Sequence, residues 1–355
     1  MKDIRQWIEL DPLDTLFFKG SEPMVAGQNH EARTVFPPMP STLIGAIRTA
    51  ILLQRGALTE FIQTGKAPSS HSLIGTPDCP GFEITGPLFS AATEDLNHEC
   101  FFPVPALWFG NMKNRKDGDP VAVQRGEMAE KEIQKLGLKG SVSSPVWVQA
   151  DKQGEIKPLV GHWANRAAFS AVAQNSKPSI IFKTSLDKIN RQTPFLLPLS
   201  AFYEIEERTG IALDTETGNR RVRKGHLYST THIRLAPGVR LLVGLSETIS
   251  PKHLDPEGVF PLGGEQRLVR YRPNAQSVTA PLEQGDWAMS LAPFPYSQME
   301  DWGWSELPRV SGPLIRMGGW DMKKGFHKPI TTFLPAGSAI RIGKEQKLPF
   351  GFIRI

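Results

Sequence analysis

The sequence predicts an α+β fold in which many short strands and ordered loops accompany few helices. Glycine and proline are both abundant, with 32 and 30 residues in a chain of 355. Such a composition favours strands, turns and loops over a helical bundle. Strong helical periodicity is confined to one stretch near residue 50, whereas strand-like runs bounded by turn residues dominate the second half. A chain of this length can hold two domains.

The strongest single element is a helix predicted from Ser41 to Arg55. Prolines at positions 37, 38 and 40 hold its approach extended, and either Ser41 or Thr42 is placed to cap the first turn. Gly56 follows Arg55, where a glycine commonly ends a helix. The apolar residues recur at the spacing of one buried helix face, and they are Leu43, Ala46, Ile47, Ala50 and Ile51.

The remaining stripe of this helix is narrow and consists of Ser41, Gly45, Arg48 and Thr49. A glycine inside a helix costs up to about 1 kcal/mol relative to alanine, so its missing side chain should serve a purpose. One use is close packing of the helix on a sheet, with Arg48 reaching the surface. The other is an RNA backbone that passes over the helix start, near the free N–H groups of Ser41 and Thr42 and the charge of Arg48.

Short strands and a possible two-domain division are expected along the rest of the chain. Strands are predicted at residues 3–10, 201–207, 268–271, 333–342 and 350–355, and residues 227–235 and 239–245 are expected to pair around the Pro237-Gly238 turn. Residues 66–165 show no convincing long element, and we interpret them as an insertion into a first domain at 1–199. A second domain is expected at 200–355.

Composition argues against a membrane protein and against a disulfide or zinc scaffold. No window approaches the roughly 18 uninterrupted apolar residues of a membrane span, and the first residues lack the apolar core of a signal peptide. Cys79 and Cys100 stand alone, without a CxxC motif or paired histidines. We therefore expect a cytoplasmic protein with no disulfide framework, no cofactor and no metal at any site.

The charge is modest in total but unevenly placed. The net charge is +5, yet residues 219–272 contain ten Lys and Arg against four Asp and Glu, and residues 308–355 contain nine against two. The remainder of the chain is acidic. A basic half of this kind indicates an extended anionic partner, of which nucleic acid is the first candidate, although chance clustering in a soluble protein gives the same numbers.

Catalytic signatures are missing from the sequence. It contains no GxGxxG after a strand, no GxxxxGK[ST], no HExxH and no GxSxG. His226 and His232 lie near the basic cluster, where a metal-ligand pair is one reading and ordinary strand or loop residues are the other. His30, on a polar loop, is a candidate general base for RNA cleavage, but a nucleic-acid contact or simple exposure is the stronger interpretation.

Several motifs, taken in order, resemble one family. DPLDTLFFKGSEPM followed by FPPMPSTLIGAIRTAIL resembles the opening of the third subunit of the CRISPR type III-B RAMP module, the Cmr complex. Further similar stretches are Gly225–Tyr228, the GGExR-like run Gly263–Arg267, and PAGS at Pro335–Ser338. Two departures are Lys19, where arginine is usual, and a thin glycine-rich loop near the C-terminus. Residues 66–165 carry nothing diagnostic.

The resemblance implies two ferredoxin-like (RRM-like) βαββαβ domains with loop-rich insertions and a non-catalytic role. It implies that the chain binds the 5′ repeat-derived tag of the guide RNA, docks on the large palm-domain subunit and contacts the backbone RAMP subunits. Two alternatives stay open: a RAMP-type endoribonuclease that processes guide RNA, and a carbohydrate- or protein-binding β-rich module. The predicted RNA-binding residues are Lys19, His30, Arg33, Ser41, Thr42, Arg48, Arg220, Arg221, Arg223, Lys224 and Arg267.

Overall fold

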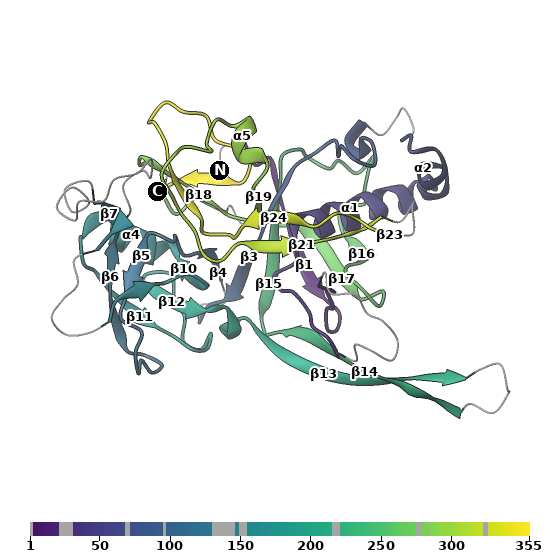
Figure 1. The fold of residues 1–355 in the computed structure, drawn as a ribbon, viewed down its shortest axis with the longest axis horizontal. Helices are drawn as coiled ribbons and strands as arrows, with labels where there is room; N and C mark the ends of the chain where they lie inside the picture. The colour runs from purple at the N-terminus through teal and green to yellow at the C-terminus, as the bar shows by residue number, and fades with distance from the viewer. Residues whose placement is uncertain are drawn as a thin grey trace.

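The computed structural model describes residues 3–20, 31–67, 72–94, 97–129, 146–148, 155–214, 221–274, 278–282, 284–321 and 326–355 (Figure 1). Within these residues the chain is rich in strands and poor in helices, in agreement with the predicted α+β class. The described helices are α1 (Pro40–Gln54), α2 (Leu58–Thr64), α4 (Arg166–Gln174) and α5 (Gln298–Asp301). No helix of this described part is both long and apolar enough to cross a membrane.

One large sheet organises the described part of the chain, where its twelve strands follow the order β16-β17-β1-β15-β3-β4-β10-β12-β11-β6-β5-β9. The strands are β1 (Gln6–Pro12), β3 (Ile84–Ala92), β4 (His98–Pro103), β5 (Trp108–Gly110), β6 (Pro120–Arg125), β9 (Lys157–Pro158), β10 (His162–Asn165), β11 (Ser179–Phe182), β12 (Phe195–Pro198), β15 (Val239–Leu245), β16 (Gly258–Pro261) and β17 (Leu268–Pro273). The sheet thus joins segments from both halves of the sequence.

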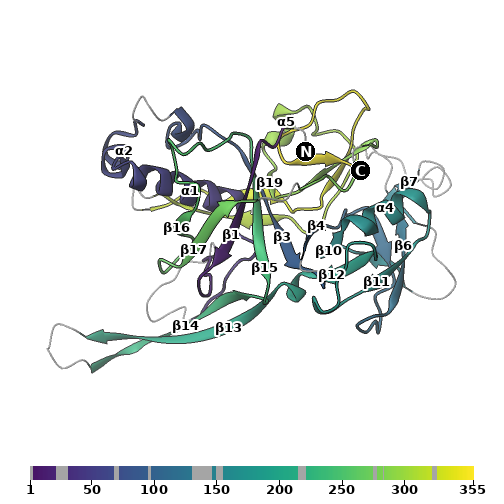
Figure 2. The same ribbon diagram turned by 180° about the vertical axis from the view of Figure 1, so that it is seen from behind.

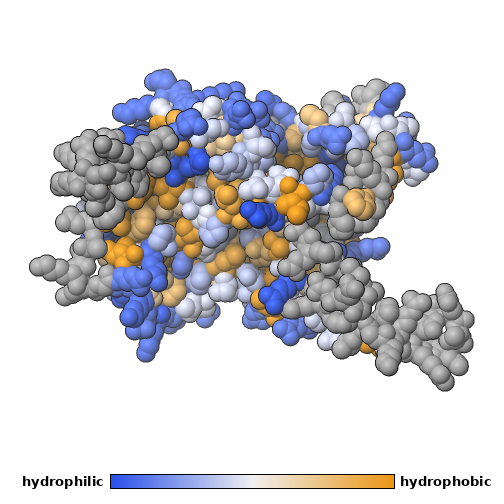
Figure 3. Space-filling model, in the orientation of Figure 1, coloured by the Kyte–Doolittle hydropathy of each residue, from blue (hydrophilic) through white to orange (hydrophobic). Residues whose placement is uncertain are grey.

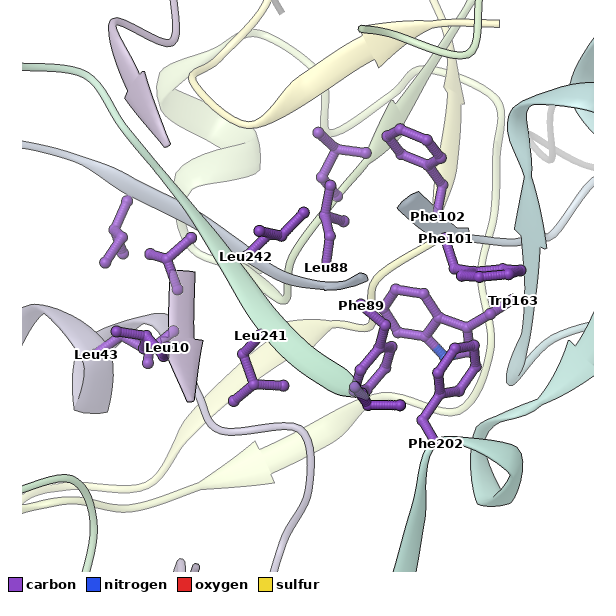
Figure 4. Packing of buried hydrophobic residues seen from close by; sticks show 14 of the residues in the cluster. Leu10, Leu43, Leu88, Phe89, Phe101, Phe102, Trp163, Phe202, Leu241 and Leu242 are labelled. Atoms are coloured by element: carbon purple, nitrogen blue, oxygen red, sulfur yellow. The ribbon is translucent and has the colours of Figure 1, made fainter. Parts of the chain in front are cut away.

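Helix α1 connects two parallel strands in the half of the sheet around β1. β1 pairs antiparallel with β15, and β15 pairs antiparallel with β3, so β1 and β3 run parallel on either side of β15. Leu43 and Ile47 of α1 are fully buried, in the same hydrophobic cluster as Leu10 and Leu241 (Figure 4). The predicted helix is confirmed to within one residue at each end.

The start of α1 differs from the prediction. Met39 is the N-cap residue, and its side chain makes no capping hydrogen bond. Ser41 and Thr42 lie inside the first turn, so neither can cap it. Pro40 occupies the first helical position instead, where its missing N–H is no loss. The predicted end is confirmed, because Gly56 adopts a left-handed conformation with φ of 66°.

Residues 66–165, interpreted from the sequence as an insertion without a convincing long element, supply strands at the centre of the sheet. β3 pairs with β15 on one side and with β4 on the other. Eight of the nine residues of β3 are buried, which hides the alternation that marks a strand with one exposed face. Helix α4 packs beside β4, with Phe169 lying 6.0 Å from Phe102 between ring centroids.

The sheet also crosses the domain boundary expected at residue 199. β15 and β17, from the expected second domain, both pair with β1 from the expected first domain. The strands that continue the sheet beyond β3, from β4 to β9, all come from residues 98–198. The second group of strands is therefore nested within the first in sequence, and a single cut at residue 199 does not separate them.

A long hairpin projects from the body of the molecule, as Figures 1 and 2 show. Its strands are β13 (Tyr203–Asp214) and β14 (Arg221–Leu235), and β2 (Glu31–Ala32) pairs with β14 in the same sheet. The predicted pairing of residues 227–235 with 239–245 is therefore wrong. β14 pairs with β13, whereas β15 enters the large sheet.

The C-terminal residues form a small unit that has a core of its own but also joins the main hydrophobic core through residues such as Trp287, Met289 and Ile353. Its strands are β18 (Trp287–Ser290), β19 (Phe294–Pro295), β20 (Arg309–Val310), β21 (Ile315–Met317), β24 (Thr331–Leu334), β25 (Ala339–Arg341) and β26 (Phe352–Arg354), with the short pair β22 (Trp320–Asp321) and β23 (Phe326–His327). Another short pair, β7 (Glu127–Met128) with β8 (Val146–Trp147), lies outside this unit. Phe294, Trp304 and Phe352 pack together in this core.

The PAGS turn, Pro335–Ser338, divides the strand that was predicted at 333–342. β24 and β25 lie in different sheets on either side of it. Gly337 has φ of 84°, and a Cβ there would lie 2.4 Å from the carbonyl oxygen of Val104. Because the turn touches the large sheet at this point, its glycine allows the C-terminal unit to approach the rest of the chain.

Candidate nucleic-acid interface

Three segments that carry the family-like motifs converge at the base of the β13–β14 hairpin. Leu16 and Ile233 exchange two backbone hydrogen bonds of 2.8 Å, which join the segment after β1 to β14. The N–H of Gly264 donates to the carbonyl of Phe17 at 2.7 Å. Residues separated by more than two hundred positions in the sequence thus form one surface.

The glycine pair at 263–264 makes this convergence possible. Gly263 has φ of 83°, and a Cβ there would lie 2.4 Å from the carbonyl oxygen of Phe17. A Cβ on Gly264 would lie 2.7 Å from the ring of Phe17. Glu265 and Gln266 continue the tight turn with positive φ. The turn directs Glu265 and Arg267 toward Asp14 and the root of the hairpin.

Charged side chains from these segments form a base network of three arginines and three carboxylates. Its members are Asp14, Glu206, Arg208, Arg234, Glu265 and Arg267. Asp14 lies 3.1 Å from Arg234, 3.1 Å from Arg267 and 3.4 Å from Arg208. Glu206 lies 2.7 Å from both Arg208 and Arg234, and Glu265 lies 2.8 Å from Arg267. The network is neutral as a whole.

The pKa values of its carboxyls follow from these pairs. Burial alone would raise the pKa of Asp14, but the N–H of Thr15 and the guanidinium groups of Arg234 and Arg208 lower it below its usual value. Hydrogen bonds from Arg234 and Arg208 likewise lower the pKa of Glu206. Both carboxyls therefore stay ionised near neutral pH and neutralise the arginines around them.

His232 lies buried beneath this network. Its Nδ1 lies 3.2 Å from the hydroxyl of Thr15, its Nε2 lies 3.1 Å from that of Thr230, and its ring stacks on Phe17. Burial lowers its pKa, which favours the neutral imidazole, while Glu265 acts in the opposite direction. Since both ring nitrogens already have partners, His232 is placed as a packing residue.

Lys19 and Arg33 lie on neighbouring segments beside the hairpin. Lys19 forms an isolated bridge with Thr34, and Thr34 also bonds to Thr231 of β14, with its N–H lying 2.8 Å from the Thr231 hydroxyl. Both basic side chains are exposed. The structure thus brings these two predicted contacts together at the edge of β14.

The basic cluster lies at the far end of the hairpin. Arg221, Arg223 and Lys224 lie in strand β14, not in the loop expected before it, and their backbone is described without their side chains. Arg220 and His30 lie outside the described residues. The cluster and the base network therefore occupy opposite ends of one hairpin.

Arg48 turns inward, unlike either use expected for it. Its Nη2 donates to the carbonyl of Thr76 at 2.5 Å, its guanidinium lies 5.3 Å from the ring centroid of Phe61, and only 9% of the residue is exposed. Burial lowers its pKa. Gly45, in contrast, is exposed, and no atom of the described residues lies within 4 Å of a Cβ placed there. Close packing against this described part of the chain is therefore not the reason for this glycine.

Sequence reasoning missed most of the base network. Asp14, Glu206, Arg208 and Arg234 were not singled out, although Glu206 and Arg208 stand two positions apart, on one face of a strand. Only the pairing of β13 with β14 brings Arg234 to them. Arg267 was predicted as a phosphate contact, but two carboxylates hold its guanidinium.

A cavity of about 660 Å³ lies elsewhere, beside β4 and the start of α4. It is lined by His98, Glu99, Arg166 and Arg191 among others. Burial raises the pKa of Glu99 to about 7, against the opposing effects of the Arg166 N–H and the Arg191 charge. Nothing in the sequence distinguished Glu99, because its unusual pKa comes from its place in the sheet.

Comparison with known proteins identifies one family and one shared fold. Residues 8–291 match the family described as CRISPR-associated protein (Cas_Cmr3). No curated protein matches. A chain from the "Type III-B Cmr-beta bound to cognate target RNA" has a TM-score of 0.51 and 15% identity, with 95% of this chain and 86% of that chain covered.

Two further solved structures are less similar. A chain of the same complex bound to cognate target RNA and AMPPnP gives a TM-score of 0.49 at 14% identity, with 95% of this chain and 86% of that chain covered. A chain of the Csm3–Csm4 subcomplex of type III-A gives a TM-score of 0.39 at 10% identity, with 98% of this chain and 96% of that chain covered. The matched region contains the Asp14–Lys19, β14 and Gly263–Arg267 segments that meet at the base network. The chain belongs to the Cmr3 family of CRISPR-associated proteins, the third subunit of the type III-B RAMP module.

Proposed function

We propose that this chain is a non-catalytic RNA-binding subunit of a type III-B CRISPR interference complex. In this proposal it holds the 5′ repeat-derived tag of the guide RNA and docks on the large palm-domain subunit and the backbone RAMP subunits. The observation that carries the proposal is the placement of exposed Lys19 and Arg33 beside a projecting hairpin whose far end carries Arg221, Arg223 and Lys224.

The hairpin geometry supports a contact with an RNA backbone. A two-stranded arm holds basic residues away from the body, where they can follow a phosphate chain. Lys19 and Arg33 extend the basic surface from the arm to the segment before α1. The exposed position of Gly45 on α1 is consistent with a partner that lies close to this helix, as expected for the RNA path near Ser41 and Thr42.

The geometry changes the set of proposed contacts in two places. Arg267 is held by Asp14 and Glu265, and Arg48 is held by the carbonyl of Thr76. A guanidinium that already has a partner contributes less free energy to phosphate binding, because the first partner must be released. We therefore assign Arg267 to fixing the hairpin base and Arg48 to fixing the loop before β3.

We also propose that the two groups of strands are the two ferredoxin-like domains. The order β17-β1-β15-β3, with α1 between β1 and β3, fits the four strands of such a domain. The connection from β15 to β17 contains no helix in its described residues, 246–267, where a complete domain would have one. The domains would then be nested, with residues 98–198 inserted between the strands of the first.

The experiment that tests the proposed function uses the assembled complex. Pull-down and sequencing of the bound RNA should recover guide RNA with its 5′ tag, and replacing Arg221, Arg223 and Lys224 by alanine should lower that recovery. The matched variant Lys344→Ala with Lys347→Ala, which alters exposed lysines of the C-terminal unit, should not.

A second measurement addresses the endoribonuclease alternative. Purified chain is incubated with end-labelled repeat RNA, and the RNA should keep its length. RNA that is shortened by the wild type but keeps its length with a His30→Ala variant would contradict the non-catalytic role.

In the pull-down experiment, equal recovery of tagged guide RNA by the wild-type and triple-alanine complexes would contradict the proposed contact.

A further inference from the structure

A second hairpin, formed by residues 315–321 and 326–334 of the C-terminal unit, carries exposed cations and an exposed aromatic ring. We call it the C-terminal hairpin; it comprises β21, β22, β23 and β24. It lies beyond residue 291, where the match to the Cmr3 family ends. The family comparison therefore assigns it no role.

Backbone pairing fixes the order of the residues from the root of this hairpin to its tip. Arg316 pairs with Thr332 near the root, and Asp321 pairs with Phe326 near the tip. Between them, the N–H of Lys328 donates to the carbonyl of Gly319 at 2.8 Å. At about 3.3 Å per residue, the six positions from Thr332 to Phe326 span about 20 Å. That length is comparable with a few nucleotides of extended RNA.

The hairpin exposes groups of both kinds that single-stranded RNA uses. Phe326 is 68% exposed and Ile330 is 66% exposed, and Arg316 and Lys328 are exposed as well. Figure 3 shows hydrophobic and hydrophilic residues side by side on the face where β21 and β24 lie. Positively charged grooves with aromatic rings bind single strands, because phosphates take the charge and bases stack on the rings.

The cations of this hairpin differ from those of the base network in having no acidic partner. Among the described residues, no carboxylate forms an ion pair with Arg316 or Lys328, whereas each arginine of the base network contacts two. Residues 308–355 contain nine Lys and Arg against two Asp and Glu. The positive charge here is available to an outside anion.

Both hairpins extend toward the same side of the molecule, as the two opposite views in Figures 1 and 2 show. The C-terminal hairpin crosses in front of α1 in Figure 1, on the side of α1 away from β1 and β17. An RNA strand that follows the β13–β14 hairpin can therefore meet a second basic arm on the same side.

We propose that the C-terminal hairpin is a second binding surface for single-stranded RNA. Arg316 and Lys328 contact phosphates, and the ring of Phe326 stacks on a base. The surface is sequence-tolerant, because neither group reads a base edge. It adds to the proposed function without depending on recognition of the 5′ tag.

The test measures binding of the purified full chain to single-stranded adenine and uracil homopolymers of about 12 nucleotides, a length within the site sizes of single-strand binders. Fluorescence anisotropy over a salt series gives the slope of log Kobs against log salt. Each phosphate contact to a single strand contributes about 0.7 to that slope, so Arg316→Ala with Lys328→Ala should lower it by about 1.4. Lys344→Ala with Lys347→Ala, a pair of equal charge outside the hairpin, should leave it unchanged.

A second variant isolates stacking. Phe326→Leu keeps an apolar side chain but removes the ring, and it should weaken binding of the adenine homopolymer about tenfold with the salt slope unchanged. Because these side chains are exposed, the melting temperature should be that of the wild type in each variant. An unchanged slope in the Arg316/Lys328 variant, or an equal loss in the Lys344/Lys347 control, overturns the proposal.

The outcomes also separate this surface from the proposed function. Homopolymer binding that depends on the C-terminal hairpin, together with a complex that fails to recover tagged guide RNA, contradicts only the proposed function. A complex that recovers tagged guide RNA normally while the hairpin variants bind homopolymers like the wild type contradicts only this inference. Hairpin-dependent binding of an acidic polyglutamate peptide, with no binding of either homopolymer, would assign the surface to a protein and overturn it.

Discussion

The two hairpins carry similar basic residues but differ in what those residues contact. At the root of the β13–β14 hairpin, Arg208, Arg234 and Arg267 are held by Asp14, Glu206 and Glu265. On the C-terminal hairpin, no carboxylate of the described residues pairs with Arg316 or Lys328. Strand β14 and the C-terminal hairpin both lie within segments that are basic in sequence. The comparison shows that the charge counted along a chain is not the charge available to a partner.

The two hairpins also differ in how closely the rest of the chain packs against them. The root of the first hairpin is fixed by backbone bonds between Leu16 and Ile233 and by the glycine turn at 263–264. The C-terminal hairpin is exposed or half-buried along nearly all of its described length. The first hairpin is therefore anchored at its root, whereas most described residues of the C-terminal hairpin are accessible to solvent.

The largest expected effect concerns the turn that builds the root of the first hairpin. Gly263→Ala places a Cβ against the carbonyl of Phe17 in a backbone conformation with positive φ, so the free energy of unfolding should fall by about 2–4 kcal/mol. Chemical denaturation measures it. Gly343→Ala is the control, because a Cβ there meets no atom within 4 Å. Similar stability of the two variants would show that the turn is not tight.

The next prediction contrasts Glu99, a buried carboxyl that lies 3.8 Å from Arg191, with the closely paired carboxyls of the base network. The pKa of Glu99 is raised to about 7 in the folded chain, above the unfolded value of about 4.5. The folded state therefore binds more protons between these pH values, and its stability falls as pH rises through that window. A difference of about 2.5 pKa units corresponds to roughly 3 kcal/mol.

Glu99→Gln removes this titration. Relative to the wild type, the variant should therefore be more stable at pH 8 than it is at pH 4.5. The stability difference between variant and wild type, measured by urea denaturation at both pH values, should grow by up to about 3 kcal/mol. A difference that stays constant between the two pH values would mean that the pKa of Glu99 is the same in the folded and the unfolded state.

A smaller effect is expected at Arg48, an arginine held by backbone groups. Arg48→Ala removes its bond to the Thr76 carbonyl, and stability should fall by about 1–3 kcal/mol while the salt slope of RNA binding stays unchanged. The matched variant Arg5→Ala removes one exposed ion pair to Glu247 and should change stability by less than about 0.5 kcal/mol. If the Arg48→Ala variant has normal stability and a lower salt slope, Arg48 contacts the RNA.

Sequence alone predicted the parts of the fold that depend on local pattern. The apolar spacing of Leu43, Ile47 and Ile51 fixes the buried face of α1 wherever the helix packs. The predicted N-cap residue was wrong because Pro40 occupies the first helical position, which places Ser41 inside the first turn. The central place of β3 was missed because a strand buried on both faces shows no alternation.

The candidate site was less predictable, because it depends on long-range pairing. The motifs at Asp14, Gly263 and Arg267 indicated importance, but nothing local shows that Asp14 contacts three arginines from other segments. The basic cluster at Arg221–Lys224 was recognised, yet its place at the far end of a hairpin follows only from the pairing of β14 with β13. Charge that is neutralised by distant residues cannot be read from a window of sequence.

The central claim, that the basic cluster at the far end of the β13–β14 hairpin binds RNA and that the paired arginines at its root hold the fold, is tested most directly by one comparison of salt slopes. Arg234→Ala removes one cation from the base network, and Arg223→Ala removes one from the far end of the same hairpin. With single-stranded guide RNA, the Arg223 variant should lower the slope of log Kobs against log salt by about 0.7, and the Arg234 variant should leave it unchanged. A fall in slope for Arg234→Ala as large as that for Arg223→Ala would contradict the account.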